Sequence, residues 1–122
     1  MNNPGQRFEQ LKRSCIELSR RSCLYDVVFV FDASGSLEGR FEEQLKVANR
    51  LIDVFDVETG ETQIAAIKYA GKGKCRLIFD FKDVLDKSSM EQRITETTIL
   101  RGTTYTNEAL MKTADILMVR FL

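Results

Sequence analysis

The sequence predicts an α/β fold built around a parallel pair of strands. Two apolar runs, residues 25–31 and 63–69, flank a segment of helical periodicity at residues 40–55. A strand, helix, strand order of this spacing implies a parallel pair joined by a right-handed crossover. The first run ends abruptly in Asp32, the start of the polar stretch DASGS. This stretch is therefore expected at the carboxyl end of a strand, where open α/β sheets bind ligands.

The chain composition excludes several classes of protein. Its 122 residues allow one domain, and its 18 basic and 18 acidic side chains leave no net charge. No overall field therefore favours nucleic acid or an anionic membrane. The start of the chain has no apolar signal-peptide region, and no apolar run approaches the ~18 residues that span a bilayer. We therefore expect no export signal, no membrane insertion and no nucleic-acid partner for this chain.

The cysteines leave the compartment open. Cys15, Cys23 and Cys75 are odd in number, and their spacing fits no metal site. The chain has no histidine, which argues against a zinc site and against a histidine-based catalytic triad. One disulfide with one thiol left over and three reduced thiols are equally consistent with the sequence.

Residues 1–24 form a basic lead-in with five basic and two acidic side chains, a net charge of +3. Apolar side chains at helical spacing predict a short helix over residues 7–20. Residues 25–31, rich in valine and phenylalanine, predict a strand buried on both faces.

The segment after DASGS predicts a four-turn helix over residues 40–55. Glu42 and Glu43 fall in its first turn, where acidic side chains interact favourably with the helix dipole. One apolar stripe is expected to face the core, formed by Phe41, Leu45, Ala48, Ile52 and Phe55.

A hairpin is predicted next. Residues 63–69 are expected as a second, mostly buried strand, and the loop GKGK at 71–74 leads into a third strand over 75–81. Leu77, Phe79 and Phe81 alternate with more polar positions, which predicts that all three share the buried face of an edge strand.

Two helices are expected at the end of the chain. The capping pattern Ser89 to Gln92 predicts a helix over residues 89–96. A last helix is expected to begin near Thr106, with an apolar stripe of Ala109, Leu110, Thr113, Ala114, Leu117 and Met118. The complete prediction is about three strands and three helices after the lead-in.

Hydroxyl and carboxylate oxygens are concentrated in two loops. Asp32, Ser34 and Ser36 alternate after the first strand, where Gly35 is expected to let the backbone bend. Oxygen-only ligands suit a hard divalent cation such as Mg²⁺, Mn²⁺ or Ca²⁺. A second hydroxyl-rich stretch, residues 101–106, precedes the last helix and is expected at the same edge of the sheet.

These two stretches resemble the von Willebrand factor A domain. DASGS matches the D-x-S-x-S motif of its metal-ion-dependent adhesion site, and GTTYTNEAL matches its G-G-T-x-T-x-x-A-L segment. The resemblance extends over residues 26–118 and implies a Rossmann-like sheet. It also implies that Ser34, Ser36 and Thr104 bind the cation directly, and that Asp32 binds it directly or through water.

The sequence departs from this family in one respect. The family places a further ligand aspartate after a fourth strand, and this sequence reaches Leu122 without it. The resemblance therefore covers about the first half of a family domain, so residues 25–122 are interpreted as a partial domain with its C-terminal half missing. The first strand would then be an exposed apolar edge, a template for self-association.

The resemblance implies a non-enzymatic, extracellular adhesion module. Neutral hydroxyl ligands leave most of the cation's charge unneutralised, so an Asp or Glu of a protein partner, including extracellular matrix, would complete the coordination. Two alternatives remain open, an intracellular assembly scaffold and a non-functional fragment of a longer secreted protein. A phosphohydrolase of the haloacid dehalogenase type is a weaker alternative, because that class needs an aspartate where this chain has Ser34.

Overall fold

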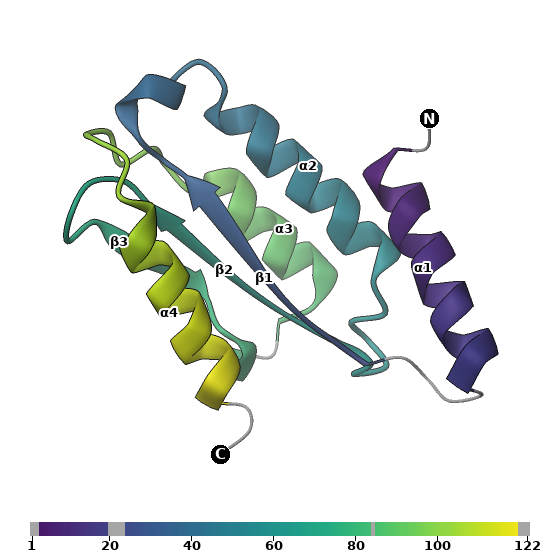
Figure 1. Cartoon of the computed structure of the whole chain (residues 1–122). Helices are drawn as coiled ribbons and strands as arrows, with labels where there is room; N and C mark the ends of the chain where they lie inside the picture. Colours follow the sequence, from purple (N-terminus) through teal and green to yellow (C-terminus); the bar gives the residue numbers. More distant parts are fainter. Residues whose placement is uncertain (1–2, 20–23, 84, 120–122) are drawn as a thin grey trace.

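The structure is a computed structural model that describes residues 3–19, 24–83 and 85–119. It is a small α/β fold with a three-stranded mixed sheet, which confirms the predicted class (Figure 1). The elements in chain order are α1 (Pro4–Ser19), β1 (Tyr25–Asp32), η1 (Gly35–Leu37), α2 (Phe41–Val54), β2 (Thr62–Tyr69), β3 (Cys75–Phe79), η2 (Phe81–Asp83), α3 (Lys87–Glu96) and α4 (Thr106–Val119).

The sheet has the strand order β1-β2-β3. Strands β1 and β2 run parallel in unbroken register, from Tyr25 opposite Thr62 to Asp32 opposite Tyr69. Strand β3 returns antiparallel to β2. Both the predicted parallel pair and the predicted hairpin are confirmed.

Helices cover both faces of the sheet. Helices α2 and α3 pack on one face, and α4 packs on the other (Figure 1). Helix α1 contacts α2. The predicted stripe on α2 is confirmed, since Phe41, Leu45, Ala48 and Ile52 are all buried. Burying one such large apolar side chain contributes about 2 kcal/mol, so this stripe holds the helix to the sheet.

The start of α1 differs from the prediction because of a cap that the sequence analysis missed. Asn3 Oδ1 accepts a hydrogen bond from Gln6 N at 2.8 Å, and Gln6 Oε1 accepts one from Asn3 N at 3.0 Å. This reciprocal pair is a capping box, and Pro4 follows it at the first helical position. The helix therefore begins at Pro4 rather than at residue 7.

Strand β1 is not buried on both faces as expected. Residues 25–30 are only half-buried, whereas the equivalent core of β2 is fully buried. The reason is that β1 lies at one edge of the sheet in the described part of the chain. The predicted exposed edge is therefore present.

The alternation expected in β3 is broken. Phe79 packs in the core on the α2 side, Phe81 packs on the α4 side, and Leu77 is 46% exposed. The cause is a register irregularity, since Phe79 lies opposite Ala66 and Leu77 lies opposite the next residue, Ile67. Such a bulge leaves one residue of β3 unpaired and turns the strand.

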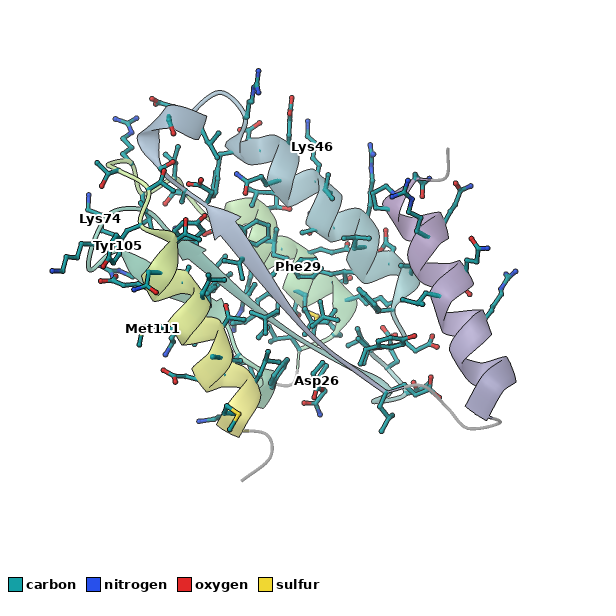
Figure 2. All side chains as sticks on the ribbon, viewed as in Figure 1. Asp26, Phe29, Lys46, Lys74, Tyr105 and Met111 are labelled. Carbon is teal, nitrogen blue, oxygen red and sulfur yellow. The ribbon has the colours of Figure 1, made fainter. Side chains whose placement is uncertain are left out.

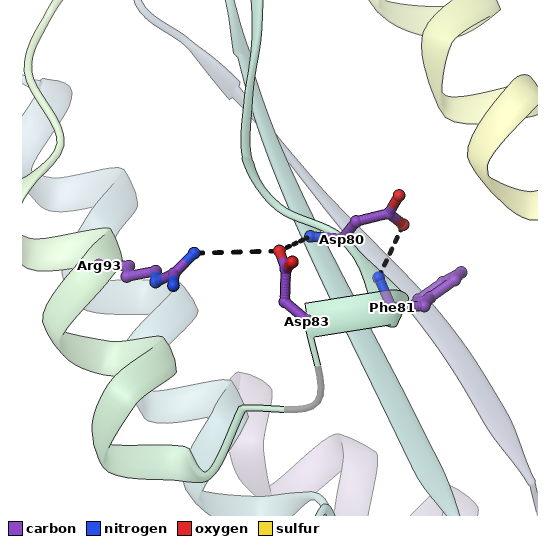
Figure 3. A network of polar contacts seen from close by, with 4 residues as sticks. All are labelled: Asp80, Phe81, Asp83 and Arg93. Atoms are coloured by element: carbon purple, nitrogen blue, oxygen red, sulfur yellow. Dashed lines mark hydrogen bonds and ion pairs between the residues drawn. The ribbon is translucent and has the colours of Figure 1, made fainter.

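A network of polar contacts lies directly after the last residue of β3 (Figure 3). Asp83 Oδ2 accepts a hydrogen bond from Asp80 N at 2.8 Å, and Asp80 Oδ1 accepts one from Phe81 N at 2.7 Å. Arg93 on α3 lies 3.9 Å from the same Asp83 oxygen. These contacts end the strand at Phe79 and convert the predicted continuation into η2.

Helix α3 begins at Lys87, two residues before the predicted start. Asp86, and not Ser89, is its cap, because Asp86 Oδ1 accepts a hydrogen bond from Ser89 N at 2.7 Å. This hydrogen bond lowers the pKa of Asp86 by favouring its ionised form.

The buried face of α4 also differs from the predicted stripe. Ala109 and Ile116 are buried, whereas Leu110 and Met118 are 60% and 59% exposed. Ala109 and Ile116 are seven residues apart and therefore share the face that packs on the sheet, whereas Leu110 and Met118 lie outside that face.

Cys75 is a free, half-buried thiol, and burial raises its pKa. Cys23 and the side chain of Cys15 lie outside the described residues. The two predicted states of the cysteines, one disulfide or three thiols, therefore both stay open. Among the residues that the structure describes, no helix is both long and apolar enough to cross a bilayer.

We expect Glu91→Gln to stabilise the fold at neutral pH. The pKa of Glu91 is raised, first by its hydrogen bond to Asp53 on α2 and then by burial. A raised carboxyl pKa means that the folded state binds the proton more tightly, so stability falls as pH rises above the unfolded value of 4.5. The variant should gain a few tenths of a kcal/mol at pH 7 and nothing below pH ~4, measured by urea unfolding. Equal gains at both pH values, or the same gain from the control Glu42→Gln, would contradict this.

Candidate metal site

The first loop of the candidate site is organised by Asp32. This residue ends β1, and its Oδ1 accepts a hydrogen bond from Ser34 N at 3.0 Å. Such a bond from an aspartate to the backbone two residues later fixes a local turn. The carboxylate is therefore held beside the two serines that follow.

The two serines converge. Their Oγ atoms lie 3.1 Å apart, and either can donate the hydrogen bond between them. Ser34 is fully buried, whereas Ser36 is exposed. The pair therefore presents one hydroxyl from inside the fold and one from its surface.

The second loop is bonded directly onto the first. Ala33 O accepts hydrogen bonds from both Leu100 N at 3.0 Å and Arg101 N at 2.9 Å. Gly35 N donates to Gly102 O at 3.0 Å. Residues 67 or 68 positions apart in the sequence are thus joined through their backbones at the end of β1.

Thr104 lies on this second loop between two backbone anchors. Gly102 is bonded to Gly35, and Tyr105 N donates to Ala70 O at 2.7 Å at the end of β2. Lys74 O accepts a hydrogen bond from Ala70 N at 2.8 Å, so Tyr105 and Lys74 belong to the same end of the sheet (Figure 2). Two residues of chain limit the separation of the Thr104 and Gly102 Cα atoms to about 7 Å. The structure therefore brings the loop of Thr104 to the loop of Asp32, Ser34 and Ser36, and leaves Thr104 exposed.

The glycine that the loops require is Gly102 rather than Gly35. Gly102 has φ 90° and Arg101 before it has φ 63°, both in the left-handed region. Gly35 has no positive φ, and a Cβ added there would make an ordinary contact, 3.5 Å from Gly102 N, so the bend of the chain at this position does not need glycine as expected. Arg101 adopts a conformation costing about 1 kcal/mol. Its Nη2 donates to Glu38 Oε1 at 2.9 Å, which links the second loop to η1.

Gln44 is a site residue that the sequence analysis missed. Its Oε1 accepts from Asp32 N at 3.0 Å, and its Nε2 donates to Asp32 O at 2.9 Å. The side chain therefore replaces the neighbouring strand that β1 lacks at this position. The signal was a polar residue on the buried side of α2, between Phe41 and Ala48, where an amide needs a partner.

Basic side chains hold the second loop from the β2 side. Lys68 Nζ donates to Thr98 O at 2.6 Å, and burial, followed by the charge of Arg76, lowers the pKa of Lys68. Lys74 Nζ lies next to Gly102, 3.2 Å from where a Cβ would be. These two lysines therefore place positive charge beside the second loop.

The donor set fits a hard cation. The described residues contain no group of three or more His, Cys, Asp or Glu side chains that could hold a metal. The candidate ligands are thus one carboxylate and three hydroxyls. Adjacent ligands of an octahedral ion at 2.1 Å are about 3.0 Å apart. The 3.1 Å between Ser34 Oγ and Ser36 Oγ matches this spacing.

The fold and the paired loops define an α/β domain of the von Willebrand type. The sequence profile of the von Willebrand factor type A domain matches residues 26–120, and the chain belongs to this family. The match covers the sheet, α2, α3, α4 and both loops of the candidate site.

Two similar proteins match most of this chain. The chain spans only a small part of the length of each. Matrilin-3 of Gallus gallus is 30% identical over 91 residues, which is 74% of this chain and 20% of that protein. The "Transmembrane cell adhesion receptor mua-3" of Caenorhabditis elegans is 30% identical over 87 residues, 70% of this chain and 2% of that protein.

Solved structures share the fold. The proximal thread matrix protein 1 of the mussel byssus, described "with zinc occupied MIDAS motif", superposes with TM-score 0.65 at 23% identity. The superposition covers 75% of this chain and 24% of that one. A second crystal form gives TM-score 0.67.

Gln44→Ala should destabilise the fold by about 1 to 2 kcal/mol, because it removes two hydrogen bonds to the Asp32 backbone. Urea unfolding measures this change. The matched control is Glu43→Ala, an exposed neighbour on the same helix, which should change stability by no more than about 0.5 kcal/mol. Equal effects of the two substitutions would show that the hydrogen bonds from Gln44 to the Asp32 backbone contribute nothing to stability.

Proposed function

We propose that the chain is a protein-binding, adhesion-type module that recognises an acidic group of its partner through a divalent cation. The observation that supports this most strongly is the convergence of Ser34 and Ser36 Oγ at 3.1 Å, beneath a second hydroxyl-bearing loop. Oxygen donors at this spacing suit a small, hard ion.

The proposed ligands are Asp32, Ser34, Ser36 and Thr104. Mg²⁺ is the proposed ion, because it accepts near-octahedral oxygen ligands and retains waters that another ligand can replace. Mn²⁺ and Ca²⁺ take similar donors. The zinc in the motif of the mussel protein supports a divalent ion at this position in the shared fold.

The charge balance of the site favours an acidic partner. A single carboxylate cannot neutralise a divalent ion, and the three hydroxyls carry no charge. A cation held there would offer an open coordination position to a carboxylate of another protein. Lys74, which lies against Gly102, adds a positive charge beside the second loop.

The relatives suggest the setting in which such a module works. One is named as a cell adhesion receptor, and another is a matrilin. By this similarity we propose a protein partner, including extracellular matrix proteins, an extracellular location and a non-enzymatic role. The described fold contributes the binding site, and the partner contributes its Asp or Glu.

Isothermal titration with Mg²⁺ and Mn²⁺ tests the proposed site. The chain should bind one ion, and Asp32→Ala and Thr104→Ala should each weaken binding by at least about tenfold. Thr103→Ala is the matched control, because it removes a neighbouring hydroxyl outside the proposed ligand set. An excess of chelator should abolish binding of a glutamate-containing peptide.

Two results would contradict the proposal. One is the absence of metal-dependent heat from a chain whose circular dichroism shows it folded. The other is equal weakening by Thr103→Ala and Thr104→Ala, which would remove Thr104 from the ligand set.

A further inference from the structure

The hairpin formed by β2 and β3 carries a concentrated positive charge. Residues 62–79, which span both strands and the turn between them, contain four basic side chains and no acidic one. The whole chain, by contrast, has equal numbers of basic and acidic side chains. The hairpin therefore has a charge of +4, from Lys68, Lys72, Lys74 and Arg76.

Two of these four side chains have contacts within the fold. Lys68 Nζ donates to Thr98 O at 2.6 Å, and Arg76 Nη1 donates to Gly73 O at 3.0 Å. Lys68 and Arg76 also lie directly opposite each other in the sheet. Like charges in that position destabilise a sheet. The pairing of β2 with β3 thus includes an electrostatic cost that an acidic ligand would relieve.

Lys72 and Lys74 are the two side chains that remain for a ligand. Both are exposed, and neither side chain forms a salt bridge or a hydrogen bond with any residue that the structure describes. Glu108 on α4 is an acidic side chain bonded to this hairpin, since its Oε2 accepts a hydrogen bond from Gly73 N at 2.8 Å. One carboxylate offsets only one of the four positive charges.

The turn fixes the positions of these two lysines. Lys74 N donates to Gly71 O at 2.9 Å, and Ala70 N donates to Lys74 O at 2.8 Å. Gly73 has φ 75°, whereas Lys72 has no positive φ, which defines a type II turn. Lys72 therefore stands at the tip of a hydrogen-bonded turn, and Lys74 ends it.

The hairpin packs directly against the second loop of the candidate site. A Cβ added at Gly71 would lie only 3.0 Å from Thr103 Oγ1, and Lys74 Nζ lies 3.2 Å from where a Cβ of Gly102 would be. The hairpin turn and the loop before α4 lie side by side at one end of the sheet (Figure 1). A ligand bound between the two loops of the site can therefore extend onto the hairpin.

We propose that the hairpin binds further acidic groups of the same partner, so that the recognised segment carries a cluster of Asp or Glu residues. This inference rests on the proposed function, in which one carboxylate of that segment completes the coordination of the cation. Lys72 and Lys74 bind the carboxylates that follow along the segment. An extended segment advances about 3.3 Å per residue, so residues a few positions apart reach both places.

The charge distribution favours a short acidic protein segment over a long polyanion. Because the chain has no net charge, the residues outside the hairpin carry a net charge of −4. A long polysaccharide with many sulfates would extend onto this negatively charged surface. A short segment confined to the cation and the hairpin meets positive charge throughout.

Binding of two peptides to the full chain tests this inference. The peptides have equal length, and one contains a single glutamate whereas the other contains four consecutive glutamates. In Mg²⁺, Lys72→Gln and Lys74→Gln should each weaken binding of the four-glutamate peptide by about two- to fivefold, the effect of an exposed ion pair, and binding of the single-glutamate peptide by less. The difference should shrink as salt concentration rises.

Lys82→Gln is the matched control, because it removes one exposed charge on η2, beyond the far end of β3. Circular dichroism checks that each variant is folded. Equal affinity of the two peptides would overturn the inference, and so would equal weakening by Lys82→Gln. A heparin fragment of equal charge that binds more tightly than the four-glutamate peptide, and depends on the same lysines, would also overturn it.

The same titrations with a chelator separate this inference from the proposed function. The single-glutamate peptide should then no longer bind, whereas the four-glutamate peptide should keep weak binding that depends on Lys72 and Lys74. Binding of the single-glutamate peptide that is unchanged by chelator would contradict the proposed function. Loss of all dependence on Lys72 and Lys74, with metal-dependent binding retained, would contradict the hairpin contact alone.

Discussion

The carbonyl of Ala33 is the contact on which the candidate site depends. It accepts two backbone hydrogen bonds from Leu100 and Arg101, while the N–H of the same residue bonds to Tyr69. Ala33 is completely buried, so a larger side chain has no room there. One residue therefore joins the end of β1 to the end of β2 and to the loop before α4. Together with the hydrogen bond from Gly35 N to Gly102 O, this junction fixes the position of one hydroxyl-bearing loop relative to the other.

The arrangement is stabilised by backbone bonds, which leaves the polar side chains available. Asp32 bonds to the Ser34 backbone through one oxygen, and the side chains of Ser34 and Ser36 bond to each other. The loop with Arg101 and Gly102 in left-handed conformations stores local strain, a feature that often accompanies functional sites. Gln44 positions Asp32, because its side chain accepts a hydrogen bond from the N–H of Asp32 and donates one to its C=O.

Much of the fold was predictable where one periodicity dominates the sequence. The stripe from Phe41 to Ile52 and the parallel pair of apolar strands have no competing interpretation. The failures have local physical causes. The bulge beside Phe79 depends on tertiary pairing, the cap at Asp86 competes with Ser89, and the apolar residues of α4 exceed what one face can bury. For the site, motif order predicted that the two loops meet. Gln44 was missed because its partner is backbone twelve residues earlier.

Paramagnetic line broadening by Mn²⁺ in an amide NMR spectrum tests the central claim, that two loops enclose one cation position. The account predicts that trace Mn²⁺ broadens the amides of Ser34, Gly35 and Ser36 together with those of Gly102, Thr103 and Thr104, and that excess Mg²⁺ restores them. Broadening confined to one loop, or centred on the exposed pair Glu42 and Glu43, would contradict it.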